Sequence, residues 1–183
     1  MTATQSTGAT TYNLDPAHTS AHFKVRHMMI SNVRGEFGKV SGTIHFDPAH
    51  PEATTVTAEI DATTINTREP QRDTHLKSGD FLDVENFPTI RFQSTKVEPA
   101  GTGKYNVTGD LTIRGVSRPV VLNVEGPTHE HKDPWGFTRA GAEATAKISR
   151  KDFGLSWNQA LEAGGVLVGD EVDISIEAEL IKA

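Results

Sequence analysis

The stretch that decides the fold runs from His75 to Leu122 and reads HLKSGDFLDVENFPTIRFQSTKVEPAGTGKYNVTGDLTIRGVSRPVVL. Within it, apolar residues alternate with polar ones over Tyr105–Arg114, which puts one face of this segment in a core and the other in water. Glycines bound this segment on both sides, and apolar residues of another strand-like segment, Thr89–Val97, precede it. The pattern predicts antiparallel strands joined by two hairpins.

Alternating segments recur along the rest of the chain, separated by turn-forming sequences such as DPAHP at 47–51 and EPAGTG at 98–103. Many short strands at this spacing predict an all-β sandwich or barrel. We expect strands at about 20–28, 33–40, 42–46, 55–64, 89–97, 104–114, 119–125, 135–149 and 171–181.

Two segments depart from the strand pattern. Arg68–Ser78 has Pro70 near its start and Gly79 just after its end, which predicts a short helix. Ser156–Gly165 is expected to form one or two helical turns that end at a glycine. Residues 1–11 offer nothing to bury and are expected to be a flexible tail, so the predicted single domain spans residues 12–183.

Composition excludes several classes of function. The 183 residues contain no cysteine, which excludes disulfides, thiolate metal sites and cysteine nucleophiles. The net charge of -6 argues against nucleic acid as a partner, since phosphate binding requires a basic surface. The first residues, MTATQSTGATT, show no signal-peptide pattern, and no apolar run has the length of a transmembrane helix. We therefore expect a cytoplasmic protein.

Several motifs in a fixed order resemble the YceI-like family of polyisoprenoid-binding, lipocalin-like proteins. The likeness extends from about Tyr12 to the C-terminus. The motifs are LDPAHTSAHFKVRHMMISNVRGEFGKVSG at 14–42, HLKSGDFLDVENFPTIRF at 75–92, GDLTIRGVSRPVVL at 109–122, FGLSW at 153–157 and VGDEVDISIEAEL at 168–180.

This resemblance implies an antiparallel, up-and-down, lipocalin-like β-barrel of about eight strands with one or two short helices. It also implies non-enzymatic binding, storage or transport of an amphiphilic polyisoprenoid, of the polyprenyl phosphate or isoprenoid quinone type, whose chain lies along the barrel axis. Relatives of this kind suggest a homodimer. The bound lipid is then the ligand, and no separate cofactor or metal is expected.

Small residues on inward-facing positions indicate that the barrel is hollow. Ala140, Ala142, Ala144 and Ala146 share one face of a strand, and Ala58, Ala62 and Gly109 take inward positions on others. An eight-stranded barrel is just wide enough either to be filled by side chains or to hold one small ligand. The alternative is a filled barrel that acts as an interaction module, with aromatic side chains in the interior: Trp135, Trp157, Phe23, Phe81 and Phe92.

The side chains expected to line a cavity are mostly apolar and almost uncharged, which favours a hydrocarbon chain over a polar metabolite. The predicted ligand-binding residues are Phe23, Val25, His27, Ile44, Phe46, Ile60, Phe81, Phe92, Leu111, Ile113, Ala144, Ile148 and Trp157.

His27 is the polar residue of this set, because it shares the inward parity of Phe23 and Val25. It is expected to be a buried, hydrogen-bonded histidine or a polar contact for a ligand head group. A second hypothesis is an enzyme that acts on a lipid or small ester with His27 as base. No nucleophile elbow, P-loop or dinucleotide-binding glycine pattern supports catalysis, so no catalytic residue is predicted.

Other polar residues allow further functional interpretations. His18 and His22, like His129 and His131, have spacings that can hold a metal ion, but the first segment lacks the glutamate of HExxH and the second has the composition of a solvated loop. No metal site is therefore predicted. The cations of the short helix have the charge to meet a ligand phosphate at the barrel mouth, although such charges usually form a solvated face: Arg68, Arg72 and Lys77.

Overall fold

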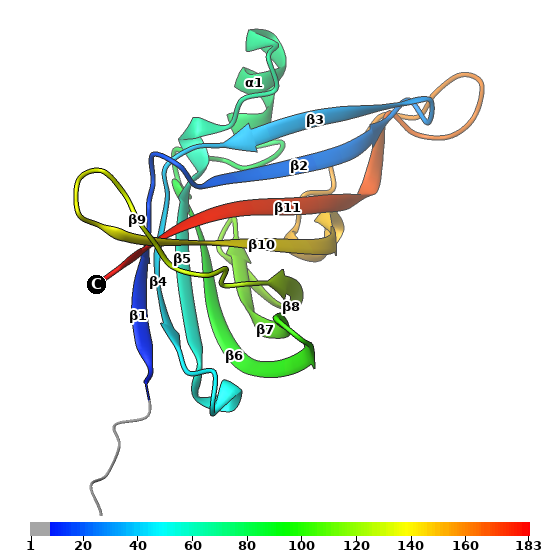
Figure 1. Cartoon of the computed structure of the whole chain (residues 1–183). Coiled ribbons are helices and arrows are strands. Elements are labelled where there is room, and N and C mark those ends of the chain that lie inside the picture. The colour runs from blue at the N-terminus through cyan, green and yellow to red at the C-terminus, as the bar shows by residue number, and fades with distance from the viewer. Residues whose placement is uncertain (1–7) are drawn as a thin grey trace, which may run out of the picture.

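The computed structural model describes residues 8–183 as one antiparallel sheet of eleven strands with short helices at its edges (Figure 1). The strands are β1 (Thr10–Leu14), β2 (Ser20–His27), β3 (Ser31–Phe37), β4 (Val40–Phe46), β5 (Thr55–Asp61), β6 (Thr89–Gly101), β7 (Lys104–Ile113), β8 (Val116–Glu125), β9 (His131–Lys132), β10 (Thr138–Ser149) and β11 (Val168–Lys182). The helices are η1 (Pro51–Ala53), η2 (Ala62–Thr64), α1 (Pro70–Lys77) and η3 (Arg150–Phe153).

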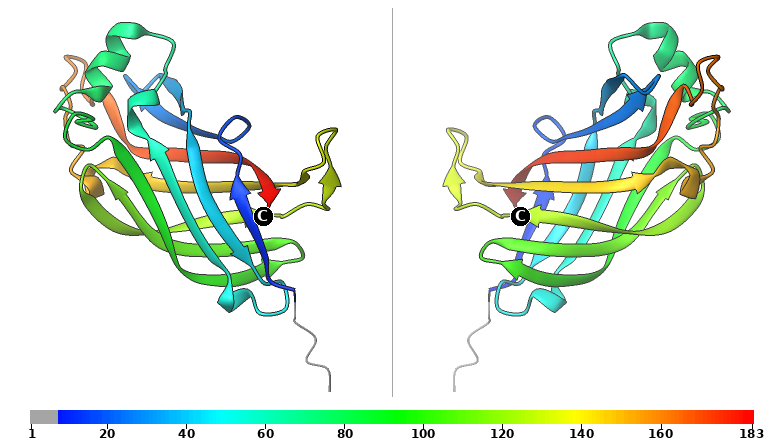
Figure 2. Two further views of the ribbon diagram at one scale, coloured as in Figure 1. Left: turned by 90° about the vertical axis from the view of Figure 1, so that its left-hand side faces the viewer. Right: turned by 90° about the vertical axis from the view of Figure 1, so that its right-hand side faces the viewer.

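Eight of these strands close into a barrel in the order β1, β4, β5, β6, β7, β8, β10, β11. The ring closes because β11 pairs with β10 along one edge and with β1 along the other. The turned views in Figure 2 show strands β4 to β8 side by side in chain order, with α1 at one end of the barrel. The predicted antiparallel, lipocalin-like barrel of eight strands is confirmed.

The β2–β3 hairpin interrupts the up-and-down order and extends the barrel wall. The first part of β11, Val168–Glu177, pairs with β2, whereas Leu180–Lys182 of the same strand pairs with β1. The hairpin therefore projects from the barrel on the side of β11, as Figure 1 shows. An isolated bridge between Glu36 and Asn66 connects the hairpin to the segment that precedes α1.

The polar helix forms where the sequence predicts it. Glu69 caps α1 through its side chain, which accepts a hydrogen bond from the backbone of Gln71, and a proline occupies the first helical position. β1 begins at Thr10, two residues before the predicted start of the domain, because Thr10 and Thr11 pair with β4. The part of the predicted tail before residue 8 lies outside the described residues.

The predicted helical turns at Ser156–Gly165 are wrong. The chain forms η3 earlier, at Arg150–Phe153, and then runs as an irregular loop closed by a bridge between Ala160 and Val166. Two interactions favour the loop. The Asn158 side chain both accepts from and donates to the backbone of Val168, and Gly164 and Gly165 have left-handed backbone angles that interrupt a right-handed helix.

Candidate ligand-binding cavity

A cavity of about 420 Å³ occupies the barrel interior. Its wall is almost entirely apolar and is built by side chains from the strands of the barrel, the β2–β3 hairpin, α1 and the loop before β11. The volume lies in the range of small-molecule sites, which enclose roughly 300 to 1,000 Å³. We call the end of the cavity next to α1 its mouth.

The structure brings all the predicted ligand-binding residues to this one wall. Their contribution to binding stays a prediction. They are Phe23, Val25, His27, Ile44, Phe46, Ile60, Phe81, Phe92, Leu111, Ile113, Ala144, Ile148 and Trp157.

Only some of the small residues predicted to face inward line the cavity. Ala142 and Ala144 line it, whereas Ala140 and Ala146 are buried in the packed clusters at the two ends of β10. Gly109 does not leave space either. A methyl group added there would meet the Phe92 ring and lie 2.6 Å from the carbonyl oxygen of Gln93. Gly109 therefore makes room for the phenylalanine ring, and the inference that it leaves an empty volume is wrong.

The aromatic residues do not fill the barrel in the way the filled-barrel alternative requires. Trp135 is 79% exposed at the turn between β9 and β10, so the expectation that it packs inside is wrong. Trp157 is in the cavity wall at the mouth, where its ring lies 4.6 Å from that of His75 and 5.4 Å from that of Phe81. These rings border an open cavity.

Two basic groups bring polarity to the apolar wall near α1. Arg72 lines the cavity, and its guanidinium donates to the hydroxyl and the carbonyl oxygen of Thr67, each over 2.8 Å. His75 also lines it and hydrogen-bonds Asp80 through Nε2 over 2.9 Å. Arg68 and Lys77, the other cations considered for a head group, are not part of the wall.

His27 lies half-buried at the same end of the cavity, opposite Val168 in the sheet. Within residues 8–183 its ring has no hydrogen-bond partner, so the predicted buried, hydrogen-bonded histidine is wrong. No carboxylate of the described residues hydrogen-bonds this ring, so nothing orients it as a general base.

Arg150 is a structural element of the mouth that the sequence analysis missed. Its buried guanidinium donates to the carbonyl oxygens of Leu155 (2.5 Å), Trp157 (2.9 Å) and Gly169 (2.8 Å). Burial lowers the pKa of Arg150, and Asp170 partly opposes this effect. The signal was present in the sequence, since Arg150 continues the even-numbered inward parity of the β10 alanines.

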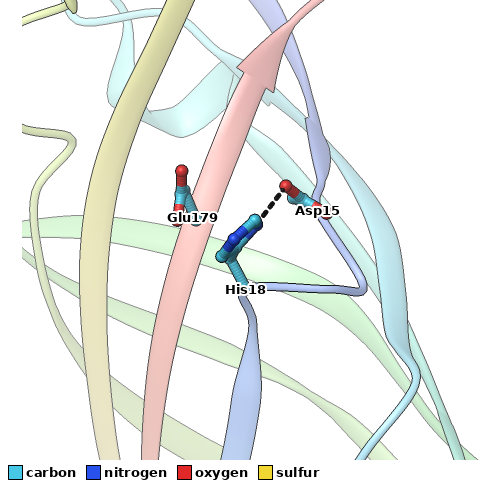
Figure 3. Close-up of side chains that lie close together, drawn as sticks. All are labelled: Asp15, His18 and Glu179. Carbon is cyan, nitrogen blue, oxygen red and sulfur yellow. Dashed lines mark hydrogen bonds and ion pairs between the residues drawn. The ribbon is translucent and has the colours of Figure 1, made fainter. Parts of the chain in front are cut away.

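The polar cluster of Asp15, His18 and Glu179 could suggest a metal site, because these side chains offer three ligand atoms within 4.8 Å of one another (Figure 3). In this cluster the guanidinium of Arg139 is the positive charge that the carboxylates bind. Its Nη1 donates to Asp15 over 2.7 Å and to Glu179 over 2.9 Å, and its Nε donates to Asp133 over 2.6 Å. The cluster is therefore an ion network that joins β10, β11 and the segments next to them.

The same ion network shifts the pKa values of Asp15 and His18. The hydrogen bond from Arg139, followed by that from His18, lowers the pKa of Asp15 to about 2. The bond to Asp15 raises the pKa of His18. His22 instead bonds Ser20, and His27 lies in the cavity wall, so these three histidines do not meet.

His129 and His131 are both exposed in the segment between β8 and β10. The residue between them, Glu130, accepts hydrogen bonds from the Tyr12 hydroxyl and the Lys182 ammonium. That segment is thus attached to β1 and β11 through Glu130.

A closed antiparallel barrel of eight strands around an apolar cavity defines the lipocalin-like class of ligand-binding barrels. The sequence profile described as the YceI-like domain matches residues 12–180. The chain therefore belongs to the YceI-like family.

Relatives and solved structures agree with this assignment. A UPF0312 protein of Vibrio cholerae is 39% identical over 139 residues, which cover 76% of this chain and 73% of the relative. The crystal structure of Burkholderia cenocepacia BcnA superimposes with a TM-score of 0.76 at 25% identity, over 91% of this chain and 98% of that one. A polyisoprenoid binding domain from Saccharophagus degradans shares the fold, with a TM-score of 0.68 at 15% identity and coverage of 96% and 100%.

Across the described residues, no helix combines the length and the apolar character needed to span a membrane.

Proposed function

We propose that this protein binds an amphiphilic polyisoprenoid, of the polyprenyl phosphate or isoprenoid quinone type, and stores or transports it without chemical change. The observation that carries the proposal is the cavity itself, whose 420 Å³ are enclosed by an almost entirely apolar wall. A hydrocarbon chain suits such a wall because it has no polar group that would stay without a partner. The polyisoprenoid-binding domain of similar fold adds support from a distant relative.

The energetics favour recognition through the tail. Burial of one CH₂-sized group contributes about 0.8 kcal/mol, so a five-carbon isoprene unit contributes up to ~4 kcal/mol before the cost of ordering the ligand. An exposed ion pair with a head group adds only about 0 to 1 kcal/mol. Affinity therefore follows the number of isoprene units in the cavity, and the head group adjusts it.

The polar groups next to α1 give the ligand a direction. Arg72, His75 and His27 all border the cavity at this end, while its remaining wall is predominantly apolar. An amphiphile therefore enters with its chain in the barrel and its head group near these three side chains. Arg72 is the best partner for a phosphate, because a guanidinium has five N–H donors and Thr67 takes only two of them.

The geometry favours a carrier over an enzyme. His27 has no hydrogen-bonded carboxylate among residues 8–183, and the other two groups at this end, His75 and Arg72, are held in the wall by their bonds to Asp80 and Thr67. We also propose that no resident cofactor or metal takes part and that the protein acts as a cytoplasmic homodimer. Light scattering of the purified protein and fractionation of cells test the last two points.

Native mass spectrometry after gentle purification tests the main proposal. A co-purified mass that differs by whole isoprene units among bound species is the expected result. In the Trp135→Phe variant, Trp157 is the single tryptophan and lies in the cavity wall. Titration with a prenyl quinone should quench its fluorescence. A protein that purifies empty and shows no quenching with either prenyl quinones or prenyl phosphates would exclude the function.

A further inference from the structure

Four large apolar side chains stand exposed together next to the cavity mouth. Met28, Met29 and Ile30 form the turn between β2 and β3 and are 42%, 58% and 75% exposed, and Val166 in the loop before β11 is 40% exposed. We call these four residues the apolar tip. Among residues 8–183, the other exposed large hydrophobic side chains lie elsewhere: Val121 on β8, and Trp135 and Phe137 in the turn between β9 and β10.

The hairpin turn and the loop form one continuous surface. The backbone N–H of Met28 donates to the carbonyl oxygen of Leu167 over 2.8 Å. The Met29 side chain packs so closely on Gly165 that a methyl group added to that glycine would overlap the Met29 sulfur. Figure 1 shows the end of the β2–β3 hairpin beside this loop, away from the C-terminus.

The backbone angles of the turn indicate that its methionines serve a function and do not stabilise the fold. Met28 and Met29 have φ angles of 50° and 62°, in the left-handed region that favours asparagine and glycine. Two consecutive methionines are unfavourable there, and their side chains remain exposed. Local strain of this kind is found where a segment serves a function.

The apolar tip is continuous with the ligand cavity. His27 directly precedes Met28, and Leu167 directly follows Val166, and both flanking residues line the cavity. A hydrocarbon surface that contacts the tip therefore also meets the mouth of the cavity.

Charge around the tip fits a phospholipid surface. Arg26 and Arg34 lie exposed on the outer face of the hairpin, and the Arg26 guanidinium donates to the carbonyl oxygen of Met29 over 3.0 Å. Three acidic residues in the first part of β11 are paired with cations: Asp170 with Arg150 and Lys151, Glu171 with Lys147, and Asp173 with Lys24 and Lys147. Glu162 of the loop is exposed. Arginine beside exposed apolar residues is typical of segments that lie in the bilayer interface.

The other apolar turn has the opposite surroundings. Trp135 and Phe137 stand next to Asp133, whose carboxylate accepts from the backbone of both residues. This turn is also followed by Arg139, but that guanidinium is occupied by three carboxylates. It therefore offers no free arginine to lipid phosphates, and it serves as an internal control.

The size of the tip favours a membrane over a protein partner. A stable protein interface buries about 800 Å² on each side, whereas four partly exposed side chains provide at most a few hundred Å². Insertion into a bilayer has no such threshold, because each apolar side chain contributes in proportion to the area it buries.

We propose that the apolar tip inserts into the interfacial layer of a lipid bilayer and holds the cavity mouth against the membrane. This inference rests on the proposed lipid-carrier function and names its partner, the phospholipid surface from which the ligand enters. The two arginines of the hairpin contact lipid phosphates, while Met28, Met29, Ile30 and Val166 reach the acyl chains. The ligand then passes between bilayer and cavity without crossing bulk water.

Flotation with vesicles of phosphatidylcholine and a minor fraction of phosphatidylglycerol tests the proposal. The wild-type chain should float with the vesicles, and the Met29→Asp/Ile30→Asp double variant should lose about tenfold or more of its vesicle affinity, since each aspartate places a charge in the apolar layer. The Trp135→Asp variant should float like the wild type. Equal flotation of the double variant, no flotation of the wild type, or an equal loss in Trp135→Asp would each overturn the proposal.

Two further measurements separate this proposal from its foundation and from a change in folding. Circular dichroism should be the same in the double variant and in Trp135→Asp. Quenching of Trp157 by a prenyl quinone without vesicles should also be the same in Trp135→Asp and in the double variant that carries Trp135→Phe in addition. If the wild type floats but never binds the prenyl compound, the carrier function fails while bilayer binding stands. A double variant that changes its mass in light scattering but floats normally would identify a second copy of the chain as the partner, against this proposal.

Discussion

Nη1 of Arg150 donates a 2.9 Å hydrogen bond to the carbonyl oxygen of Trp157. The same side chain bonds the carbonyl oxygens of Leu155 and Gly169, so one buried guanidinium joins η3, the loop that carries Trp157 and the first residues of β11. Backbone carbonyl groups of this irregular loop thus obtain hydrogen-bond donors from the Arg150 side chain. Arg150 therefore positions Trp157 at the cavity mouth through the backbone of its loop.

The Arg150→Met variant should be destabilised by about 3 kcal/mol, because its apolar side chain leaves buried carbonyl oxygens without donors. Urea unfolding monitored by circular dichroism measures the loss. Lys151→Met is the control, since its exposed ammonium pairs only with Asp170 and is expected to change stability by less than about 1 kcal/mol. Equal unfolding midpoints for the two variants would contradict the role assigned to Arg150.

Ala144 and Thr145 are neighbours on β10 with opposite orientations. Ala144 lines the cavity and Thr145 is exposed on the outside of the barrel. Ala144→Phe should reduce the affinity for a prenyl quinone about tenfold or more, since its ring occupies ligand volume. Thr145→Phe should bind as the wild type does. Fluorescence titration of both variants decides the matter, and unchanged affinity in Ala144→Phe would show that the ligand does not use this part of the cavity.

Gly109→Ala should destabilise the protein by about 1 to 3 kcal/mol, because the added methyl group must displace the Phe92 ring or the backbone at Gln93. Gly79 provides the matched control. Its position has no atom within 4 Å of an added methyl group, so Gly79→Ala should leave stability nearly unchanged. Thermal unfolding compares the two variants, and equal melting temperatures would be evidence against close packing at Gly109.

The folded-state pKa of Asp15, about 2, lies below the ordinary value of 3.8, chiefly because Arg139 donates to its carboxylate. A lowered pKa means that this carboxylate stabilises the fold above the unfolded value, and that the contribution is lost as the pH falls through about 2. The size of the contribution is about 2 kcal/mol. Unfolding free energies measured between neutral and acidic pH should therefore fall more steeply in the wild type than in Asp15→Asn. Parallel curves would rule out this linkage.

The sequence was sufficient for the residues whose position follows from strand parity. Val25, Leu111 and Ala144 alternate with polar neighbours, and a strand in a closed barrel must send alternate side chains inward. The family motifs occur in the same order along nearly the whole chain, and this order predicts the lipocalin-like barrel. Together they placed the predicted ligand-binding residues on one wall without any knowledge of strand pairing.

Features that depend on contacts between distant segments were beyond sequence reasoning. Arg150 has the inward parity of β10, but arginine is rarely buried, so the pattern alone does not predict its place in the interior. Arg139 meets Asp15 from a position 124 residues away, and no local pattern encodes such a pair. The size of Trp135 favours an interior position, but the turn made by Asp133 directs it outward. The glycines of the loop before β11 match the pattern of a helix end, but in the structure their left-handed backbone angles belong to an irregular loop.

The position of β11 has a consequence for the biogenesis of the protein. This strand pairs with β1, β2 and β10, and its register matches Tyr12 with Lys182. During synthesis, β1, β2 and β10 therefore each keep an unpaired edge until Val168–Lys182 has left the ribosome. The apolar interior is open to water for the same period, and exposed apolar surface with unpaired strand edges favours aggregation. A nascent chain stalled before Val168 would contain seven of the eight barrel strands, but the barrel would remain open between β10 and β1.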